Sequence, residues 1–219
     1  MTSPRLDIPT PSSLDAVRDM YEASADKYSQ MMDVEIDLPV YADTLERLCR
    51  RIGDVRGPIV DVACGSGHML ARIRERYDSG RELIGLDLSP RMVAITSERL
   101  GRNGRAIVGD MTRLAMVHDS SAAALMNFFA LHHLDPASVR SALREWRRVL
   151  PEGGQLIVAA WEGERAIDYG DHSDVVALRY RSDDLRRWSE EAGFTVTRCV
   201  VEPVEEFPMD AIYLEGTAS

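Results

Sequence analysis

The sequence lacks the features of an exported or membrane-bound protein. No apolar run approaches the roughly 18 to 20 residues of a membrane-spanning helix, and the start, MTSPRLDIPTPSSLD, lacks the apolar core of a signal peptide. The three cysteines, Cys49, Cys64 and Cys199, are far apart and form no CxxC pair, so neither a disulfide framework nor a metal site is indicated. We therefore expect a cytoplasmic protein that has no metal and binds no membrane.

Basic residues are outnumbered by acidic ones. The chain has 26 lysines and arginines against 36 aspartates and glutamates, a formal net charge of −10, whereas nucleic-acid proteins usually carry a basic field or stripe. The arginine pairs at 147–148 and 186–187 stand on expected helices beside acidic residues, as on a solvated face. We expect a small-molecule partner and no nucleic acid, and the sequence leaves the oligomeric state open.

The remaining composition is that of one folded domain. The 219 residues are 45% hydrophobic and 28% charged, which supplies a core and a polar surface. Residues 1–13 hold three prolines among serines and threonines and are expected to form a flexible tail. Apolar residues at helical spacing predict a helix from 14 to about 31 and another after Pro39. We assign 14–219 to a single domain whose helical cap covers about 14–55.

After Gly57 and Pro58, short apolar runs alternate with helical stretches, which is typical of βαβ units and a parallel sheet. Ser89-Pro90 and Asp135-Pro136 each place an N-cap before a proline at the first helical position. This order predicts an α/β fold, with a Rossmann-like, seven-stranded, mostly parallel sheet, helices on both faces and an N-terminal helical cap. The expected strands are 59–63, 83–87, 105–108, 122–127, 155–161, 194–201 and 211–215.

The sharpest local feature is the segment VDVACGSG at 60–67, where an apolar strand enters a turn of small residues and then a helix. Glycines let the backbone approach a ligand, and a helix N-terminus favours negative groups. About twenty residues later Asp87 ends the next strand, where a carboxylate can accept both hydroxyls of a ribose. Leu70 stands where a dinucleotide-binding GxGxxG pattern has its third glycine, so an adenosyl ligand without a pyrophosphate fits better than NAD.

From Leu14 to Glu215 the chain resembles the class I methyltransferases that use S-adenosylmethionine (SAM). DVACGSG at 61–67 is similar to their first motif, an acidic residue followed by three alternating glycines, with Ala63 in place of the first glycine. Alanine is expected to restrict this turn slightly. Four further segments resemble later parts of the family pattern in the same order: LDLSPRM at 86–92, GDM at 109–111, NFFALHHL at 127–134 and RVLPEGG at 148–154.

The resemblance implies a SAM site, with S-adenosylhomocysteine (SAH) as the product. It implies that Asp87 takes the ribose, that the apolar residues after it flank the adenine, and that Asp110 accepts from the adenine amino group. A helix folded over the cofactor would bring Tyr21 and Tyr28, which are two helical turns apart, to the methionine end. The implied cofactor-binding residues are Tyr21, Tyr28, Asp61, Ala63, Cys64, Gly65, Gly67, Asp87, Leu88, Met92, Asp110, Met111, Asn127 and Phe128.

Several of these residues also have a purely structural interpretation. Asp110 could cap the turn that follows it, and Asn127 could be a turn residue at a strand end. Met92 could belong to the core. Tyr21 and Tyr28 could be core aromatics whose hydroxyls reach the surface. The sequence leaves these alternatives open.

Catalysis requires little from such a protein beyond alignment. Methyl transfer from a sulfonium is an in-line displacement with a neutral leaving group, so the protein mainly positions donor and acceptor. A base is needed only where the acceptor must lose a proton. The candidate catalytic bases are His132 and His133, and the alternative is that they only satisfy backbone groups.

The acceptor pocket is expected between the N-terminal helices and the loop 162–180, beyond the carboxyl ends of the strands. Acidic residues in both segments suit a cationic or amine-bearing acceptor, but a solvated acidic surface explains them equally well. The residues concerned, including further candidates for a base, are Glu35, Asp37, Asp168, Tyr169, Asp171 and His172.

Two other functions share these motifs. The same fold can use SAM for cyclisation or decarboxylation, and it can serve as a catalytically silent binding partner. The complete set of ligand-facing residues argues against a silent protein: Gly65, Gly67, Asp87, Asp110 and Asn127. We expect transfer of a methyl group from SAM to an oxygen, nitrogen or carbon nucleophile of a small molecule.

Overall fold

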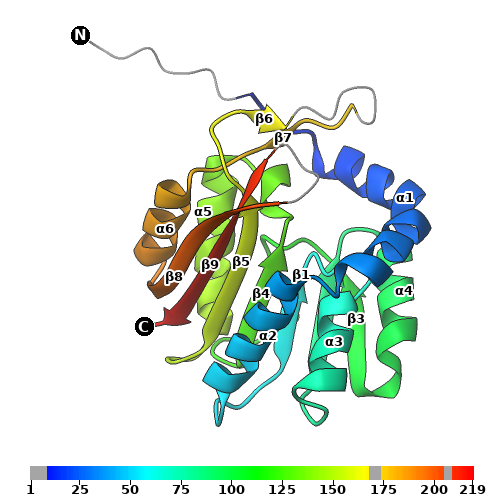
Figure 1. Cartoon of the computed structure of the whole chain (residues 1–219), viewed down its shortest axis with the longest axis vertical. Coiled ribbons are helices and arrows are strands. Elements are labelled where there is room, and N and C mark those ends of the chain that lie inside the picture. Colours follow the sequence, from blue (N-terminus) through cyan, green and yellow to red (C-terminus); the bar gives the residue numbers. More distant parts are fainter. Residues whose placement is uncertain (1–8, 168–173, 205–208) are drawn as a thin grey trace.

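A seven-stranded sheet forms the centre of the structure (Figure 1). The computed structural model describes residues 9–167, 174–204 and 209–219. The strand order is β3-β2-β1-β4-β5-β9-β8; the first five are parallel, and β9 is antiparallel to both of its neighbours. This confirms the predicted α/β fold. The strands are β1 Ile59–Val62, β2 Leu83–Asp87, β3 Gly104–Val108, β4 Ala124–Phe128, β5 Gln155–Trp161, β8 Phe194–Pro203 and β9 Asp210–Ala218.

Helices cover both faces of this sheet (Figure 1). Side chains of consecutive strand residues point to opposite faces, and the two cores follow this alternation. Ile59 packs with residues of α2 and α3, whereas Val60 and Val62 belong to the core formed with α5 and α6. The helices are α1 Leu14–Glu35, α2 Pro39–Ile52, α3 His68–Arg76, α4 Pro90–Leu100, α5 Pro136–Val149 and α6 Ser182–Glu191, with short 3₁₀ turns η1 Gly101–Asn103 and η2 Leu131–His133.

The two predicted helix starts are confirmed. Ser89 Oγ accepts a hydrogen bond from the Met92 N–H at 3.1 Å. Asp135 Oδ1 accepts from the N–H groups of Ala137 at 2.8 Å and Ser138 at 3.1 Å. These bonds satisfy donors that the first helical turn leaves open, and the proline that follows each cap already has a helical φ. The caps fix where α4 and α5 begin relative to the ends of β2 and β4.

The structure differs from the sequence prediction mainly at the ends of elements. Helix α1 continues to Glu35, and β9 continues to Ala218. A two-stranded antiparallel ribbon, β6 Ala166–Ile167 with β7 Ala177–Leu178, was not predicted. Each strand of this ribbon has two residues, which is too short for an alternating pattern to show.

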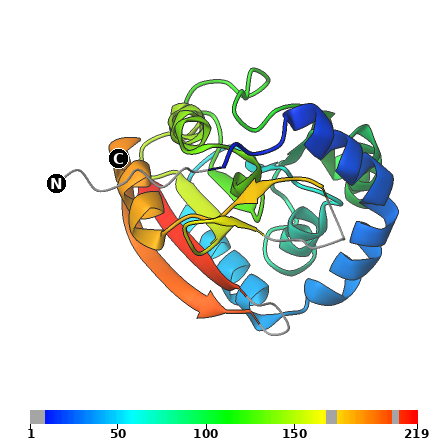
Figure 2. The same cartoon turned by 90° about the horizontal axis from the view of Figure 1, so that it is seen from above.

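Helix α1 lies across the carboxyl edge of the sheet, beside α4 (Figures 1 and 2). Ser13 caps it, accepting from the Ala16 N–H at 3.3 Å. Ser12 exchanges two hydrogen bonds with Val176, next to β7, at 3.0 and 2.8 Å. The last residues of the predicted tail are thus attached to the ribbon, while 1–8 lie outside the described residues. The division into a tail and one domain stays a prediction.

Within the described ranges, no helix has the length and apolar character that crossing a bilayer requires.

Candidate functional site

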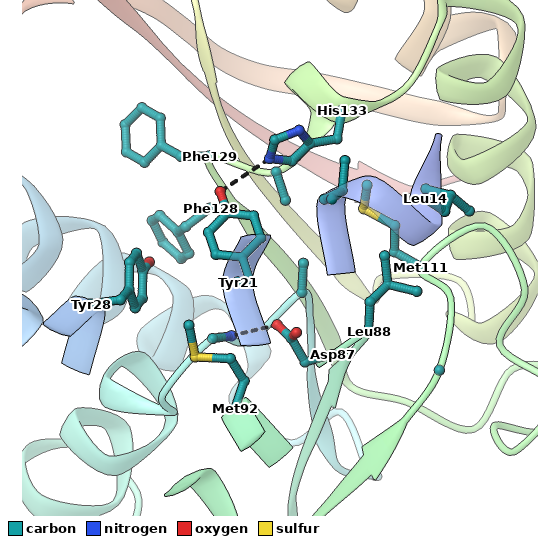
Figure 3. A pocket seen from close by; sticks show the side chains of 15 residues that line it. Leu14, Tyr21, Tyr28, Asp87, Leu88, Met92, Met111, Phe128, Phe129 and His133 are labelled. Atoms are coloured by element: carbon teal, nitrogen blue, oxygen red, sulfur yellow. Dashed lines mark hydrogen bonds between the residues drawn. The ribbon is translucent and has the colours of Figure 1, made fainter. Parts of the chain in front are cut away.

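A pocket opens beneath α1, at the carboxyl ends of β1, β2, β3 and β4 (Figure 3). Ligands of open parallel sheets bind at this edge. The wall is largely apolar, and its polar side chains are Asp87, His133 and two tyrosines. The lining residues are Leu14, Val17, Tyr21, Tyr28, Ala63, Gly65, Asp87, Leu88, Met92, Gly109, Met111, Phe128, Phe129, Ala130 and His133.

A second, smaller pocket adjoins the first behind the glycine turn. The two pockets share Tyr28, Ala63, Phe128 and Phe129 as walls. The second pocket is more polar than the first, because Asp61, Cys64, Ser66 and His68 contribute to it. Its other lining residues are Met32, Tyr41, Asp61, Cys64, Ser66, His68 and Met69.

Asp87 ends β2 with its carboxylate in the larger pocket (Figure 3). One oxygen accepts from the Gly65 N–H and the other from the Ser89 N–H, both at 2.9 Å. The side chain is largely buried, and this burial raises the pKa of the carboxyl group. Each oxygen keeps lone pairs beyond the backbone bond it accepts, so the carboxylate can accept two ribose hydroxyls.

The glycine turn after β1 leaves space where side chains would clash. Gly65 has φ +52°, and a β-carbon there would lie 2.9 Å from Cε1 of Tyr28. Ala63 has φ 59°, in the left-handed region that favours glycine. The slight restriction expected of alanine in this turn is therefore a strained backbone at Ala63. Gly67 opens α3 and contacts Thr96 rather than either pocket.

Asp61 brings a buried carboxylate to the second pocket. Its side chain is 2% exposed and lines this pocket. Burial, together with the nearby Asp87, raises its pKa well above the usual value. A buried carboxylate is costly unless it is paired with a donor or a cation. This observation fits the amino group at the methionine end of SAM.

The two tyrosines of α1 line the larger pocket, which favours a binding role over a purely structural one. The Tyr21 hydroxyl lies 3.0 Å from Nε2 of His133 (Figure 3). Tyr28 packs over Gly65, and its ring meets Tyr21 edge-to-face at a centroid distance of 6.2 Å. Burial raises the pKa of Tyr28, so its phenol is neutral. Helix α1 is therefore part of the site as well as a cover for it.

The two histidines differ in their access to the pocket. His133 lines it, and burial lowers the pKa of His133 to about 4, so the ring is neutral near pH 7. His132 stacks behind it at a ring distance of 3.9 Å and lines neither pocket. Neither nitrogen of His132 has a hydrogen-bond partner among the described residues. The geometry favours His133 as the histidine that meets a ligand.

Besides Gly67, two further predicted cofactor residues, Asp110 and Asn127, line neither pocket. Asp110 Oδ1 accepts from the Thr112 N–H at 2.8 Å, which is the turn-capping alternative. Asn127 is buried and donates to the Val62 carbonyl at 2.8 Å, while its Oδ1 has no partner among the described residues. Met92, by contrast, is buried and also lines the pocket.

Of the two segments expected to form the acceptor pocket, only one lines it in the described structure. Helix α1 contributes to it, but the described parts of 162–180 line neither pocket. Glu35 and Asp37 do not line the pockets, and Asp37 pairs with Arg72 at 2.7 Å. The candidates Asp168, Tyr169, Asp171 and His172 lie outside the described residues.

Some lining residues were missed. Leu14 and Val17 share the helical stripe of Tyr21 and Tyr28, so the same periodicity could have assigned them to the pocket. Phe129 has φ 51°, and this conformation has no signal in the sequence. No cluster of three or more metal-binding side chains occurs in the described part of the chain.

Residues 59–154 match the family model described as a methyltransferase domain. A demethylmenaquinone methyltransferase from Thermotoga maritima is 36% identical over 100 residues, 46% of this chain and 42% of that protein. A 23S rRNA (guanine(748)-N(1))-methyltransferase from Streptomyces fradiae is 29% identical over 149 residues, 66% of this chain and 49% of that protein. The chain thus spans less than half the length of each of these relatives.

A solved structure of similar extent is 1,6-didemethyltoxoflavin-N1-methyltransferase from Burkholderia thailandensis, with bound 1,6-didemethyltoxoflavin and SAH. It has a TM-score of 0.74 at 19% identity and covers 98% of this chain and 93% of that chain. Residues 59–154 therefore match a methyltransferase domain, and the chain as a whole shares the fold of this solved methyltransferase.

Proposed function

We propose that this protein binds SAM across the two pockets and transfers its methyl group to a small molecule. The observation that carries the proposal is the Asp87 carboxylate, held by two backbone N–H groups and facing an apolar pocket. A carboxylate at the end of the second parallel strand is suited to the two hydroxyls of a ribose.

The remaining pocket residues are assigned by their chemistry. Leu88, Met92 and Met111 are apolar and flank the adenine side, while Asp61 and Tyr28 hold the methionine side. The sulfonium of SAM supplies an electrophilic methyl group when the cofactor is bound. The protein's part is to hold an acceptor in line with that group and to exclude water, which the side chains of Phe128 and Phe129 favour.

His133 is the proposed base for an acceptor that must lose a proton. The acceptor's lone pair forms the new bond to the methyl carbon, the carbon–sulfur pair stays on sulfur to give neutral SAH, and the proton passes to a ring nitrogen of His133. With its pKa lowered to about 4, His133 is neutral near pH 7, and a neutral imidazole has one ring nitrogen whose lone pair can accept a proton. An acceptor without such a proton needs only the alignment.

A small molecule is supported over a nucleic acid by the charge of the site. Among the described residues that line the two pockets, none is a lysine or an arginine. A phosphate backbone is normally held by such residues. The Streptomyces relative is named for an rRNA substrate, so this charge pattern is the feature that favours a small molecule here.

The three free cysteines support a reducing, cytoplasmic compartment.

The direct test uses SAM labelled in its methyl group. Incubation with a cell extract, followed by separation into small molecules, RNA and protein, shows where the label goes. We predict label in the small-molecule fraction, and for an acceptor that loses a proton we predict that His133→Ala lowers the rate at least about 100-fold. His132→Ala, behind the pocket wall, is the matched control.

Two results would contradict the proposal. Label found in RNA would replace the small-molecule acceptor with a nucleic acid. Turnover of an acceptor without incorporation of label would favour cyclisation or another non-methylating use of SAM.

A further inference from the structure

Glu22 links the helix over the pocket to the strand end that carries Asp87. Its carboxylate accepts from the Ser89 hydroxyl at 2.5 Å and from the Arg91 N–H at 2.9 Å. Both donors belong to the start of α4, so a negative side chain of α1 sits at the positive end of another helix. Glu22 itself lies on an exposed part of α1, whereas Ser89 is fully buried.

Ser89 connects Glu22 to Asp87, the carboxylate that is proposed to bind the ribose. Its N–H donates to Asp87 at 2.9 Å, and its hydroxyl oxygen accepts from the Met92 N–H at 3.1 Å. Since Ser89 has one hydroxyl proton, donation to Glu22 fixes the rotor and leaves the oxygen lone pairs for Met92. Asp87 in turn accepts from Gly65. One series of hydrogen bonds therefore runs from α1 through the β2–α4 turn to the glycine turn.

Two other acids of α1 pair with side chains of α4 and α3. Asp26 pairs with the Arg91 side chain at 2.6 Å, and Asp33 pairs with His68 at 2.7 Å. These contacts hold α1 to α4 and α3 through side chains. Glu22 differs because it accepts from the backbone of α4 and from the residue that binds Asp87.

We propose that Glu22 is a positioning residue for the cofactor: by bonding Ser89 and the α4 N-terminus, it couples the docking of α1 to the orientation of Asp87. The proposal rests on the proposed SAM site. It means that Glu22 raises cofactor affinity and slows cofactor release without touching the cofactor. Bound cofactor should in turn hold α1 more firmly, since coupling between two sites is reciprocal.

The test is the binding of SAH, which needs no acceptor. We predict that Glu22→Ala weakens SAH binding about tenfold in calorimetry, as expected for loss of hydrogen bonds to a charged group. Glu22→Gln keeps an acceptor oxygen and should recover part of this loss. Asp19→Ala is the matched control, because Asp19 is an exposed acid of the same helix whose partner is the adjacent Arg18.

Two further readouts separate positioning from general destabilisation. In hydrogen exchange, SAH should protect α1 in the wild type and in Asp19→Ala but much less in Glu22→Ala. In the Ser89→Ala background, Glu22→Ala should have less than about half its effect, because the two residues act in one series.

The possible failures are distinguishable. SAH binding by Glu22→Ala within twofold of both the wild type and Asp19→Ala overturns the coupling and leaves the cofactor site in place. The coupling is also overturned if the losses of SAH affinity caused by Glu22→Ala and Ser89→Ala add fully in the double variant. A wild type that binds no SAH overturns the proposed function together with the coupling.

Discussion

Ala63 adopts a backbone conformation that alanine avoids. Its φ of 59° lies in the left-handed region, where the β-carbon crowds the following carbonyl oxygen at a cost of about 1 to 2 kcal/mol. The residue lines both pockets and precedes the turn that carries Gly65. The strain therefore sits at the cofactor site, where a glycine would relieve it.

We predict that Ala63→Gly raises the free energy of unfolding by about 0.5 to 1 kcal/mol, because the relieved strain exceeds the added entropy of the unfolded chain. Ala71→Gly, inside α3, is the control and should lower it by about 1 kcal/mol. Urea denaturation measures both changes. Equal losses of stability in the two variants would show that the turn is not strained.

For single residues, the sequence predicted which residues lie at the pocket better than it predicted which groups they contact. Asp87 and Gly65 follow strands whose ends the apolar pattern marks, so their place at the pocket could be predicted. The role of Asp110 could not, because whether a carboxylate faces a pocket or caps the next N–H depends on its rotamer. Glu22 was missed because its partner Ser89 is 67 residues away and only the docking of α1 brings them together.

Among the elements, α2 is attached to the sheet by a buried charge. Glu215 of β9 is 1% exposed and accepts from Arg47 at 2.8 Å and from Arg51 at 2.6 Å, both on α2. The arginines remain partly exposed. Removing the acid leaves these two guanidinium groups, and that of Arg198 at 3.8 Å, without their negative partner at a buried site.

We predict that Glu215→Gln lowers the free energy of unfolding by about 2 to 3 kcal/mol, somewhat less than for a fully buried pair because the arginines keep some water contact. Glu191→Gln is the control: its pair with Arg140 is exposed, and its loss should cost less than about 1 kcal/mol. Chemical denaturation of both variants checks this. A cost for Glu215→Gln no larger than the control's would mean that the buried pair does not hold α2 in place.

The long elements followed from the sequence and the short ones did not. The strands of the sheet appear in the sequence as largely apolar runs of four residues or more, and the helices are marked by apolar residues at helical spacing or by their caps. The ribbon of β6 and β7 has two residues in each strand, less than the pattern needs. Its place depends on hydrogen bonds to residues far away in the chain, such as that between Ser12 and Val176.

For the whole molecule, alternating strands and helices predict the sheet, and the sheet predicts the edge at which a ligand binds. The acceptor does not follow from the topology, because one fold serves many chemistries. It depends on side chains that the cap and the loops bring to the pocket, such as Leu14 and Phe129. The acidic net charge and the absence of basic residues among the described pocket linings both favour a small molecule over a nucleic acid as the acceptor.

The central claim is that Asp87 anchors SAM at the carboxyl edge of the sheet, and calorimetry with SAM and SAH tests it most directly. We predict that the wild type binds both, and that Asp87→Ala weakens both at least about 100-fold, since two charge-assisted hydrogen bonds are lost. Asp110→Ala, which removes a turn cap outside the pockets, should change affinity less than about threefold. Absent binding by the wild type, or undiminished binding by a folded Asp87→Ala variant, would contradict the claim.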